Sequence, residues 1–116
     1  GLILPGGMPG AQNLSLHEGL RKSLIAHNLR ETLIAVICAA PMVLGRRDLL
    51  NGRRATCYPG FEHELRGAQV VDDRVCEDGH IITARGPGCT VDFAFAIAAR
   101  FVDSATISRV RADMLL

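Results

Sequence analysis

The sequence predicts an α/β fold with a mainly parallel sheet and a short β-hairpin. Residues 1–4 and 33–37 are apolar runs, the second rich in branched side chains, as in parallel strands covered on both faces. A helical pattern lies between them, so strand, helix and strand follow in the order of a right-handed crossover. Asp78-Gly79, between two further short strands, is a strong hairpin signal.

The first two helices are predicted from their start signals. Ser15 and Glu18 have the spacing of a capping box, and the helix that they open is expected to end near Asn28. A second helix is expected from residue 39 to about residue 46, because Pro41 suits a first helical turn.

The middle of the chain is expected to consist of short elements. Asn51-Gly52 marks a turn, and a helical turn is predicted at residues 61–65. Short strands are predicted at residues 53–57, 69–71, 74–77 and 80–84.

The last part of the chain is predicted to be helical. Residues 90–102 are apolar nearly all round, with Asp92 and Arg100 as the only charges. Such a helix is expected to be buried on several sides, against the sheet and either a further layer or a subunit interface. Asp103 or Ser104 can cap a final short helix.

Composition excludes several classes of protein. The chain has 116 residues, 48% hydrophobic and 22% charged, which predicts at most one globular domain. A net charge of +1 gives no basic footprint for nucleic acid or for an anionic membrane surface. No apolar run reaches the length of a membrane span. We therefore expect neither nucleic acid nor a membrane as a partner.

The first residues indicate a longer polypeptide. The chain opens directly on a strand, without an initiator Met or any lead-in. We therefore expect residues 1–116 to be the C-terminal portion of a single domain.

The four cysteines, Cys38, Cys57, Cys76 and Cys89, include no CxxC pair and do not suggest a disulfide framework. Free thiols in a reducing compartment are expected, which indicates a cytoplasmic protein. None of the four histidines pairs with a cysteine at the short spacing of a zinc site, so no metal is expected. Cys57 and Cys76 are interpreted as structural, and Cys89 as either structural or partly reactive.

Cys38 is the strongest candidate for chemistry. It follows a buried strand and precedes the Pro41 helix, at the edge of the sheet where open α/β folds bind ligands. Unpaired N–H groups at a helix start stabilise a thiolate, which is the nucleophilic form of cysteine. The alternative is a small core residue, since free cysteine is among the most buried residue types.

Gly6 and Gly7 follow the first strand and are expected at the same edge of the sheet. The backbone N–H groups of Gly7 and Ala39 would then stabilise an oxyanion formed when Cys38 attacks a carbonyl group. Taken alone, the Pro-Gly-Gly stretch is more typical of a simple turn.

Four segments together resemble the ThiJ/PfpI superfamily, in the branch of the Parkinsonism-associated deglycase and its bacterial YajL-like relatives. They are LILPGGMPGAQNL, AVICAAPMVL, ATCYPGFEHEL and IITARGPGCTVDFAFAI, and the resemblance extends over essentially the whole chain. It implies a flavodoxin-like three-layer α/β sandwich, usually a homodimer, with a reactive cysteine between a strand and a helix.

The resemblance also implies roles for individual residues. Cys38 matches the family's nucleophilic and oxidisable cysteine, and Gly7 and Ala39 match the positions that line the oxyanion site. Gly6 belongs to the same loop. The segment formed by Arg85, Gly86 and Pro87 resembles the one that borders the site, partly across the dimer interface.

Two features depart from the family pattern. The family's cysteine is held by a protonated glutamate from an early loop, which would lie upstream of residue 1, and no glutamate of this chain corresponds to it. Many relatives have a histidine near the cysteine where this chain has Tyr58. A phenol cannot act as a base near neutral pH, so a Cys-His peptidase is disfavoured. The Tyr58 hydroxyl can instead orient a substrate.

Two functions follow from the resemblance. The first is a cofactor-free enzyme of the glyoxalase III or deglycase type, acting on reactive dicarbonyls such as methylglyoxal or on early glycation adducts of proteins. The second is a non-catalytic, redox-sensing chaperone whose Cys38 is oxidised. Turnover of methylglyoxal, against stoichiometric oxidation of Cys38, distinguishes them.

Overall fold

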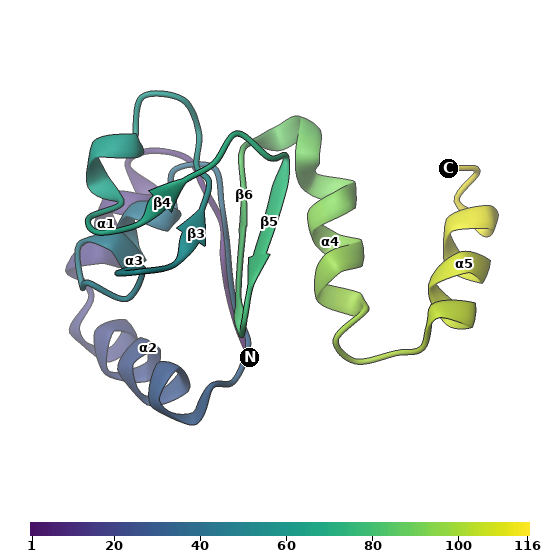
Figure 1. Cartoon of the computed structure of the whole chain (residues 1–116), viewed down its shortest axis with the longest axis horizontal. Coiled ribbons are helices and arrows are strands. Elements are labelled where there is room, and N and C mark those ends of the chain that lie inside the picture. Colours follow the sequence, from purple (N-terminus) through teal and green to yellow (C-terminus); the bar gives the residue numbers. More distant parts are fainter.

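The computed structural model describes residues 1–116 and has helices on both faces of a central sheet (Figure 1). The sheet has four strands in the order β1-β2-β6-β5. They are β1 (Leu2–Leu4), β2 (Ile34–Ile37), β6 (Ile81–Ala84) and β5 (Val75–Asp78). The first three are parallel, whereas β5 runs antiparallel to β6 and is joined to it by the predicted hairpin. The predicted α/β class and mainly parallel sheet are therefore confirmed.

The strand register sets where the loops emerge. Leu4 of β1 pairs with Val36, and Ile37 of β2 pairs with Ala84 of β6. The three parallel strands therefore end at one edge of the sheet, where ligand sites of open α/β sheets lie.

Two apolar layers enclose the central strand. Ile34 and Val36 belong to the larger core cluster, under α1 (Gly10–Leu16), α2 (Glu18–Arg30) and α3 (Pro41–Gly45). Ala35 belongs to the smaller cluster on the opposite face, with Phe93 of α4 (Thr90–Ala98). The uninterrupted apolar run of β2 is explained by this two-sided burial.

The remaining elements are short. The strands β3 (Arg54–Ala55) and β4 (Gln69–Val70) form a separate parallel pair, shorter than predicted, and the 3-10 turn η1 (Glu62–Glu64) lies between them in sequence. A second 3-10 turn, η2 (Pro87–Cys89), leads into α4, and α5 (Ser104–Asp113) follows, capped by Asp103. Figure 1 shows α5 standing beyond α4, on the side away from the sheet.

The predicted capping box at Ser15 and Glu18 is wrong. Ser15 lies in the last turn of α1, where its hydroxyl accepts a hydrogen bond from Arg46 at 3.1 Å. The chain breaks at His17, whose Nδ1 accepts the N–H of Leu20 at 3.0 Å and so caps α2. The helix also continues past Asn28, to Arg30. The residues predicted to start a helix therefore lie inside and after α1, a helix that the sequence did not predict.

The expected burial of residues 90–102 on several sides is also not found within this chain. The helix ends at Ala98, and Phe93 is its only buried residue. Its outer side faces an apolar groove towards α5, where Arg111 lies over the ring of Phe95 at 4.8 Å.

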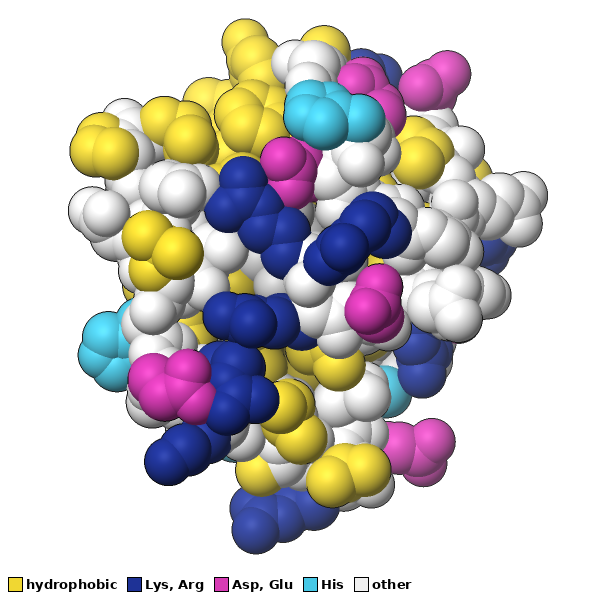
Figure 2. All heavy atoms as spheres, turned by 90° about the vertical axis from the view of Figure 1, so that its left-hand side faces the viewer, with side chains coloured by type: hydrophobic (Ala, Val, Ile, Leu, Met, Phe, Trp, Pro, Cys, Tyr) yellow, Lys and Arg dark blue, Asp and Glu magenta, His cyan; other side chains and the backbone are white.

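The helical face of α1–α3 carries mixed charge. Figure 2 shows Lys and Arg side chains gathered across its middle, with Asp and Glu side chains among them. Arg46 pairs with Glu64 at 2.6 Å on this side of the molecule. None of the helices is both long enough and apolar enough to span a bilayer.

Candidate functional site

Cys38 occupies a sharp turn at the end of β2. Its φ is +66°, in the left-handed region that residues other than glycine rarely adopt. Its N–H donates to the carbonyl of Ala84 at 2.9 Å, and its carbonyl accepts the N–H of Tyr58 at 2.8 Å. These bonds hold a conformation that costs about 1–3 kcal/mol, and such strain gathers at functional sites.

The loop after β1 closes on this turn. A Cβ atom at Gly6 would lie 2.5 Å from the Cβ of Cys38 and 2.8 Å from the carbonyl oxygen of Ile37. Only glycine therefore fits at position 6. The next residue, Gly7, has φ +87°, which again suits glycine. The structure thus brings together the two segments that the sequence placed at one edge of the sheet.

A hollow of about 270 Å³ lies over the thiol. It is lined by Gly6, Gly7, Ile37, Cys38, Pro87 and Thr90. Cys38 is half-buried and is the only titratable side chain among them. Thr90 was not foreseen from the sequence. Its hydroxyl donates to the carbonyl of Pro87 at 2.7 Å, as expected for a threonine at the start of a helix.

Backbone donors are available beside the thiol. The N–H groups of Gly7 and Ala39 make no hydrogen bond within the chain. Ala39 is only 2% exposed, so its N–H is an unusual unpaired donor in the interior. The helix that follows, α3, has five residues and begins only at Pro41. A helix this short contributes little dipole, so the N–H groups of Gly7 and Ala39 are unpaired backbone donors next to Cys38 in sequence or along the wall of the hollow.

A second groove, of about 320 Å³, adjoins the hollow and shares Pro87 with it. Tyr58, Arg85 and Gly86 line it, as do two residues that no motif indicated, Asp72 and Arg74. Tyr58 packs against Gly86, because a Cβ at that glycine would lie 3.2 Å from the ring. The residues expected to border the site therefore lie in a groove beside it.

The other cysteines are buried. Burial raises the pKa of the Cys57 thiol to about 11, and the nearby Glu62 carboxylate adds to the effect. Burial also raises the pKa of Cys76. Cys89 is 6% exposed and lies on the wall of the groove. Cys38 is thus the only one of the four cysteines that is not buried.

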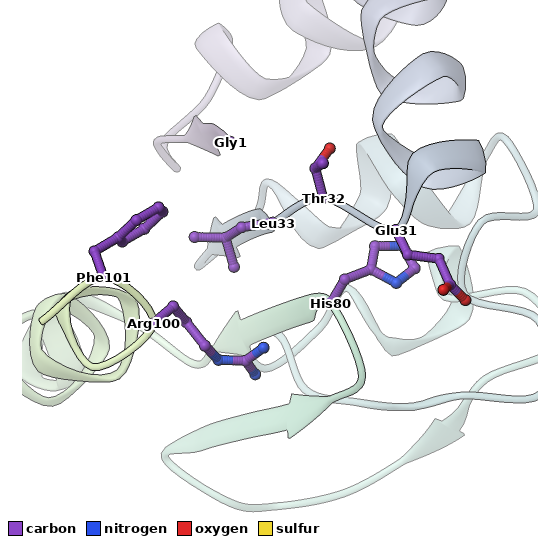
Figure 3. A pocket seen from close by; sticks show the side chains of 7 residues that line it. All are labelled: Gly1, Glu31, Thr32, Leu33, His80, Arg100 and Phe101. Carbon is purple, nitrogen blue, oxygen red and sulfur yellow. The ribbon is translucent and has the colours of Figure 1, made fainter. Parts of the chain in front are cut away.

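A further hollow lies at the opposite end of the sheet, next to the starts of β2 and β6 (Figure 3). His80 lies on its wall, and its Nε2 is 2.9 Å from the side-chain oxygen of Asn28. Arg100 is bonded to Glu77 at 3.0 Å and to the carbonyl of Gly79 at 2.9 Å. This hollow contains no cysteine, and no group of His, Cys, Asp or Glu in the structure is arranged to hold a metal ion.

Comparison with known proteins agrees with this geometry. The sequence pattern of the DJ-1/PfpI family matches residues 1–100. The chain is 34% identical to the Parkinson disease protein 7 homolog of Danio rerio over 118 aligned positions, 99% of this chain and 62% of that protein. It is 41% identical over 98 positions to Protein DJ-1 homolog B of Arabidopsis thaliana, covering 83% of this chain and 22% of that protein.

A solved structure has the same fold. The crystal structure of Drosophila melanogaster DJ-1beta superposes with a TM-score of 0.93 at 34% identity, covering 98% of this chain and 62% of that one. The chain thus spans less than two thirds of the length of these relatives. Over that length the sequence pattern and the flavodoxin-like fold coincide, and the chain belongs to the DJ-1/PfpI family.

Proposed function

We propose that Cys38 is the nucleophile of a cofactor-free enzyme of the glyoxalase III or deglycase type. Its substrates are small reactive dicarbonyls such as methylglyoxal, or the early glycation adducts that they form. The carrying observation is the half-buried thiol in a small hollow lined by Gly7, together with the unpaired N–H groups of Gly7 and of Ala39, the residue after Cys38. A nucleophile beside two free donors is the arrangement needed to attack a carbonyl group.

The first step forms a bond between sulfur and carbon. The Cys38 thiolate attacks the aldehyde carbon, and the π electron pair moves to the aldehyde oxygen, which Gly7 and Ala39 stabilise as an oxyanion. Protonation of that oxygen gives a hemithioacetal. Removal of its carbon-bound proton, and return of a proton to the neighbouring carbonyl carbon, give the thioester of a 2-hydroxy acid. Water cleaves the thioester, so methylglyoxal plus water yields lactate and the free thiol.

The proton transfers need a group from outside the hollow, because Cys38 is its only titratable side chain. We propose that a glutamate outside residues 1–116 supplies it, and that residues 1–116 form the C-terminal portion of the domain, since the chain spans 62% of the length of two relatives. A carboxylic acid there would donate to the thiolate and then carry protons between substrate atoms.

The experiment begins with an intact mass, to establish which polypeptide is present. Methylglyoxal consumption is then measured for the wild type, Cys38→Ser and Cys76→Ser, since Cys76 is buried in β5 and lines neither the hollow nor the groove. Turnover is expected to fall by about 100-fold or more in Cys38→Ser, since the covalent step is lost, and to persist in the buried-cysteine control. Equal turnover in wild type and Cys38→Ser would contradict the assignment.

Redox sensing is the second candidate. The same free N–H groups can hold the oxygens of a sulfenic or sulfinic acid at Cys38. Peroxide would then add about 16 or 32 Da to the Cys38 peptide alone. Stoichiometric oxidation of Cys38 without methylglyoxal turnover favours this function. A chaperone activity would then depend on the oxidation state of Cys38.

We also propose that the protein acts as a cytoplasmic homodimer. Proteins of this family are commonly dimeric. Light scattering of the purified protein tests the assembly, and a monomer at micromolar concentration would contradict it.

A further inference from the structure

The groove beside Cys38 contains a cation, Arg85, that has no hydrogen-bonded carboxylate. Arg85 donates no hydrogen bond from its guanidinium, and the nearest carboxylate oxygen, on Asp72, is 4.0 Å away on a side chain that is 98% exposed. The side chain of Arg85 is nonetheless two-thirds buried, with 32% exposed. Its guanidinium therefore belongs to a mostly buried side chain and has no carboxylate at hydrogen-bond distance.

The other arginine of the groove differs. Arg74 donates to the carbonyl of Gly88 at 2.5 Å and pairs with Asp92 at 3.4 Å. Its charge is thus compensated from α4. Arg85 remains the free cation of the groove, and its five N–H donors match the geometry of a carboxylate.

Tyr58 lies next to this cation and offers a second donor. Its ring packs against Gly86, the residue after Arg85, and its hydroxyl makes no hydrogen bond within the chain. Tyr58 is 45% exposed as a residue and lines the groove. A phenol and a guanidinium together bind an anion with fixed orientation.

Both residues are tied to the backbone of Cys38. The N–H of Cys38 is bonded to Ala84, directly before Arg85, and the carbonyl of Cys38 is bonded to Tyr58 itself. Pro87 forms a wall shared by the hollow over the thiol and the groove. A small ligand with its reactive carbon at the thiol can therefore extend an anionic group into the groove.

We propose that Arg85 and Tyr58 form a carboxylate-binding subsite, and that the preferred substrates are small carbonyl compounds that carry a carboxylate. The substrate class rests on the proposed function, because it assumes that Cys38 attacks a carbonyl group. The subsite itself does not depend on turnover. A neutral dicarbonyl would occupy only the hollow, whereas an acid would also engage the guanidinium.

A matched pair of alkylating reagents tests the subsite without requiring catalysis. Iodoacetate and iodoacetamide are nearly isosteric, and each forms one S–C bond to the Cys38 thiolate with loss of iodide. Only the first carries a carboxylate. The ratio of their second-order rate constants at Cys38, followed by peptide mass, cancels any change in the reactivity of the thiol itself.

The expected result is a lower ratio of iodoacetate to iodoacetamide in Arg85→Gln, by about fivefold, and a smaller decrease in Tyr58→Phe. Arg109→Gln, an exposed residue of α5, removes the same charge away from the site and should leave the ratio unchanged. An unchanged ratio in Arg85→Gln, or an equal fall in Arg109→Gln, would overturn the proposal. Loss of methylglyoxal turnover with an intact ratio would instead count against the proposed reaction alone.

Discussion

The carbonyl of Cys38 accepts the N–H of Tyr58 at 2.8 Å, so a residue 20 positions further along the chain fixes the turn that presents the thiol. The other side of the turn is held by Ala84 of β6. Cys38 is thus positioned by backbone hydrogen bonds from two separate segments. Its geometry also requires the absence of a side chain at Gly6, where a Cβ would lie 2.5 Å from the Cβ of Cys38.

Position 6 is expected to reject any side chain. In Gly6→Ala the new methyl group would meet the Cβ of Cys38 at 2.5 Å, and either the loop or the turn must move. The free energy of unfolding should fall by about 1–3 kcal/mol. The rate at which Cys38 is alkylated should also differ from that of the wild type. Gly10→Ala is the control, since nothing lies within 4 Å of a Cβ there. Urea denaturation measures both variants, and equal stabilities would refute the close approach.

Arg46 is expected to stabilise the α1–α3 face through its hydrogen bonds. It donates to Glu64 at 2.6 Å, to Gln12 at 2.6 Å and to Ser15 at 3.1 Å. Arg46→Met should lower the free energy of unfolding by about 1.5–3 kcal/mol, because partly buried partners lose a charged donor. Arg21→Met removes only a solvent-exposed pair with Glu18, and should cost less than about 1 kcal/mol. A similar loss in both variants would show that burial of the Arg46 network has no effect.

Thiol labelling is expected to single out Cys38. At pH 8 the Cys57 thiol stays protonated, because its pKa is raised to about 11 by burial and by Glu62. Iodoacetamide should therefore modify one cysteine in the folded protein and all four in urea, as read from peptide masses. The raised pKa of Cys57 also stabilises the fold below pH 9, and this contribution is lost as pH rises towards 11. Rapid native labelling of Cys57 would contradict its burial.

His80 is expected to make stability depend on pH in the mildly acidic range. Burial lowers its pKa, and Arg53 and Arg100 lower it further, whereas Glu31 and Asp78 oppose the shift (Figure 3). Above pH 6.5 the imidazole is neutral in both the folded and unfolded states. Below it the unfolded state binds the proton more readily, so the free energy of unfolding falls as pH decreases through this range.

Denaturant titrations between pH 7.5 and about 5 measure how steeply the free energy of unfolding changes with pH. His80→Gln should flatten this dependence, whereas His63→Gln, whose side chain is 75% exposed, should not. The carboxyl groups with lowered pKa, such as Glu64, act at more acidic pH, below their ordinary value of 4.5. A slope unaffected by His80→Gln would show that the buried imidazole does not contribute.

Patterns local in sequence predicted most of the fold. The apolar run of β2 and the Asp78-Gly79 turn reflect burial and backbone preferences of adjacent residues, and both were confirmed. The capping box failed because the helix break at His17 depends on where α1 docks, through Ser15 and Arg46. The exposure of α4 could not be read from its composition either, since composition reports apolarity and not the presence of a covering layer.

The candidate site shows the same division. Cys38, Gly6 and Gly7 could be proposed because strand ends in a parallel sheet meet at one edge. The left-handed φ of Cys38 and the hydrogen bond from Tyr58 could not, because both depend on segments that are distant in sequence. The lack of a hydrogen-bonded carboxylate at Arg85 was equally hidden, since it depends on Asp92 pairing with Arg74 and on Asp72 pointing to solvent at 4.0 Å.

The left-handed backbone conformation of Cys38 favours glycine for stability, whereas the proposed chemistry requires a thiol there. Glycine adopts φ +66° freely, so Cys38→Gly should be more stable than Cys38→Ala by about 1 kcal/mol. Among variants without the thiol, selection for heat resistance would therefore favour glycine over alanine at position 38. Selection that also demands reactivity would retain the cysteine and compensate elsewhere in the chain.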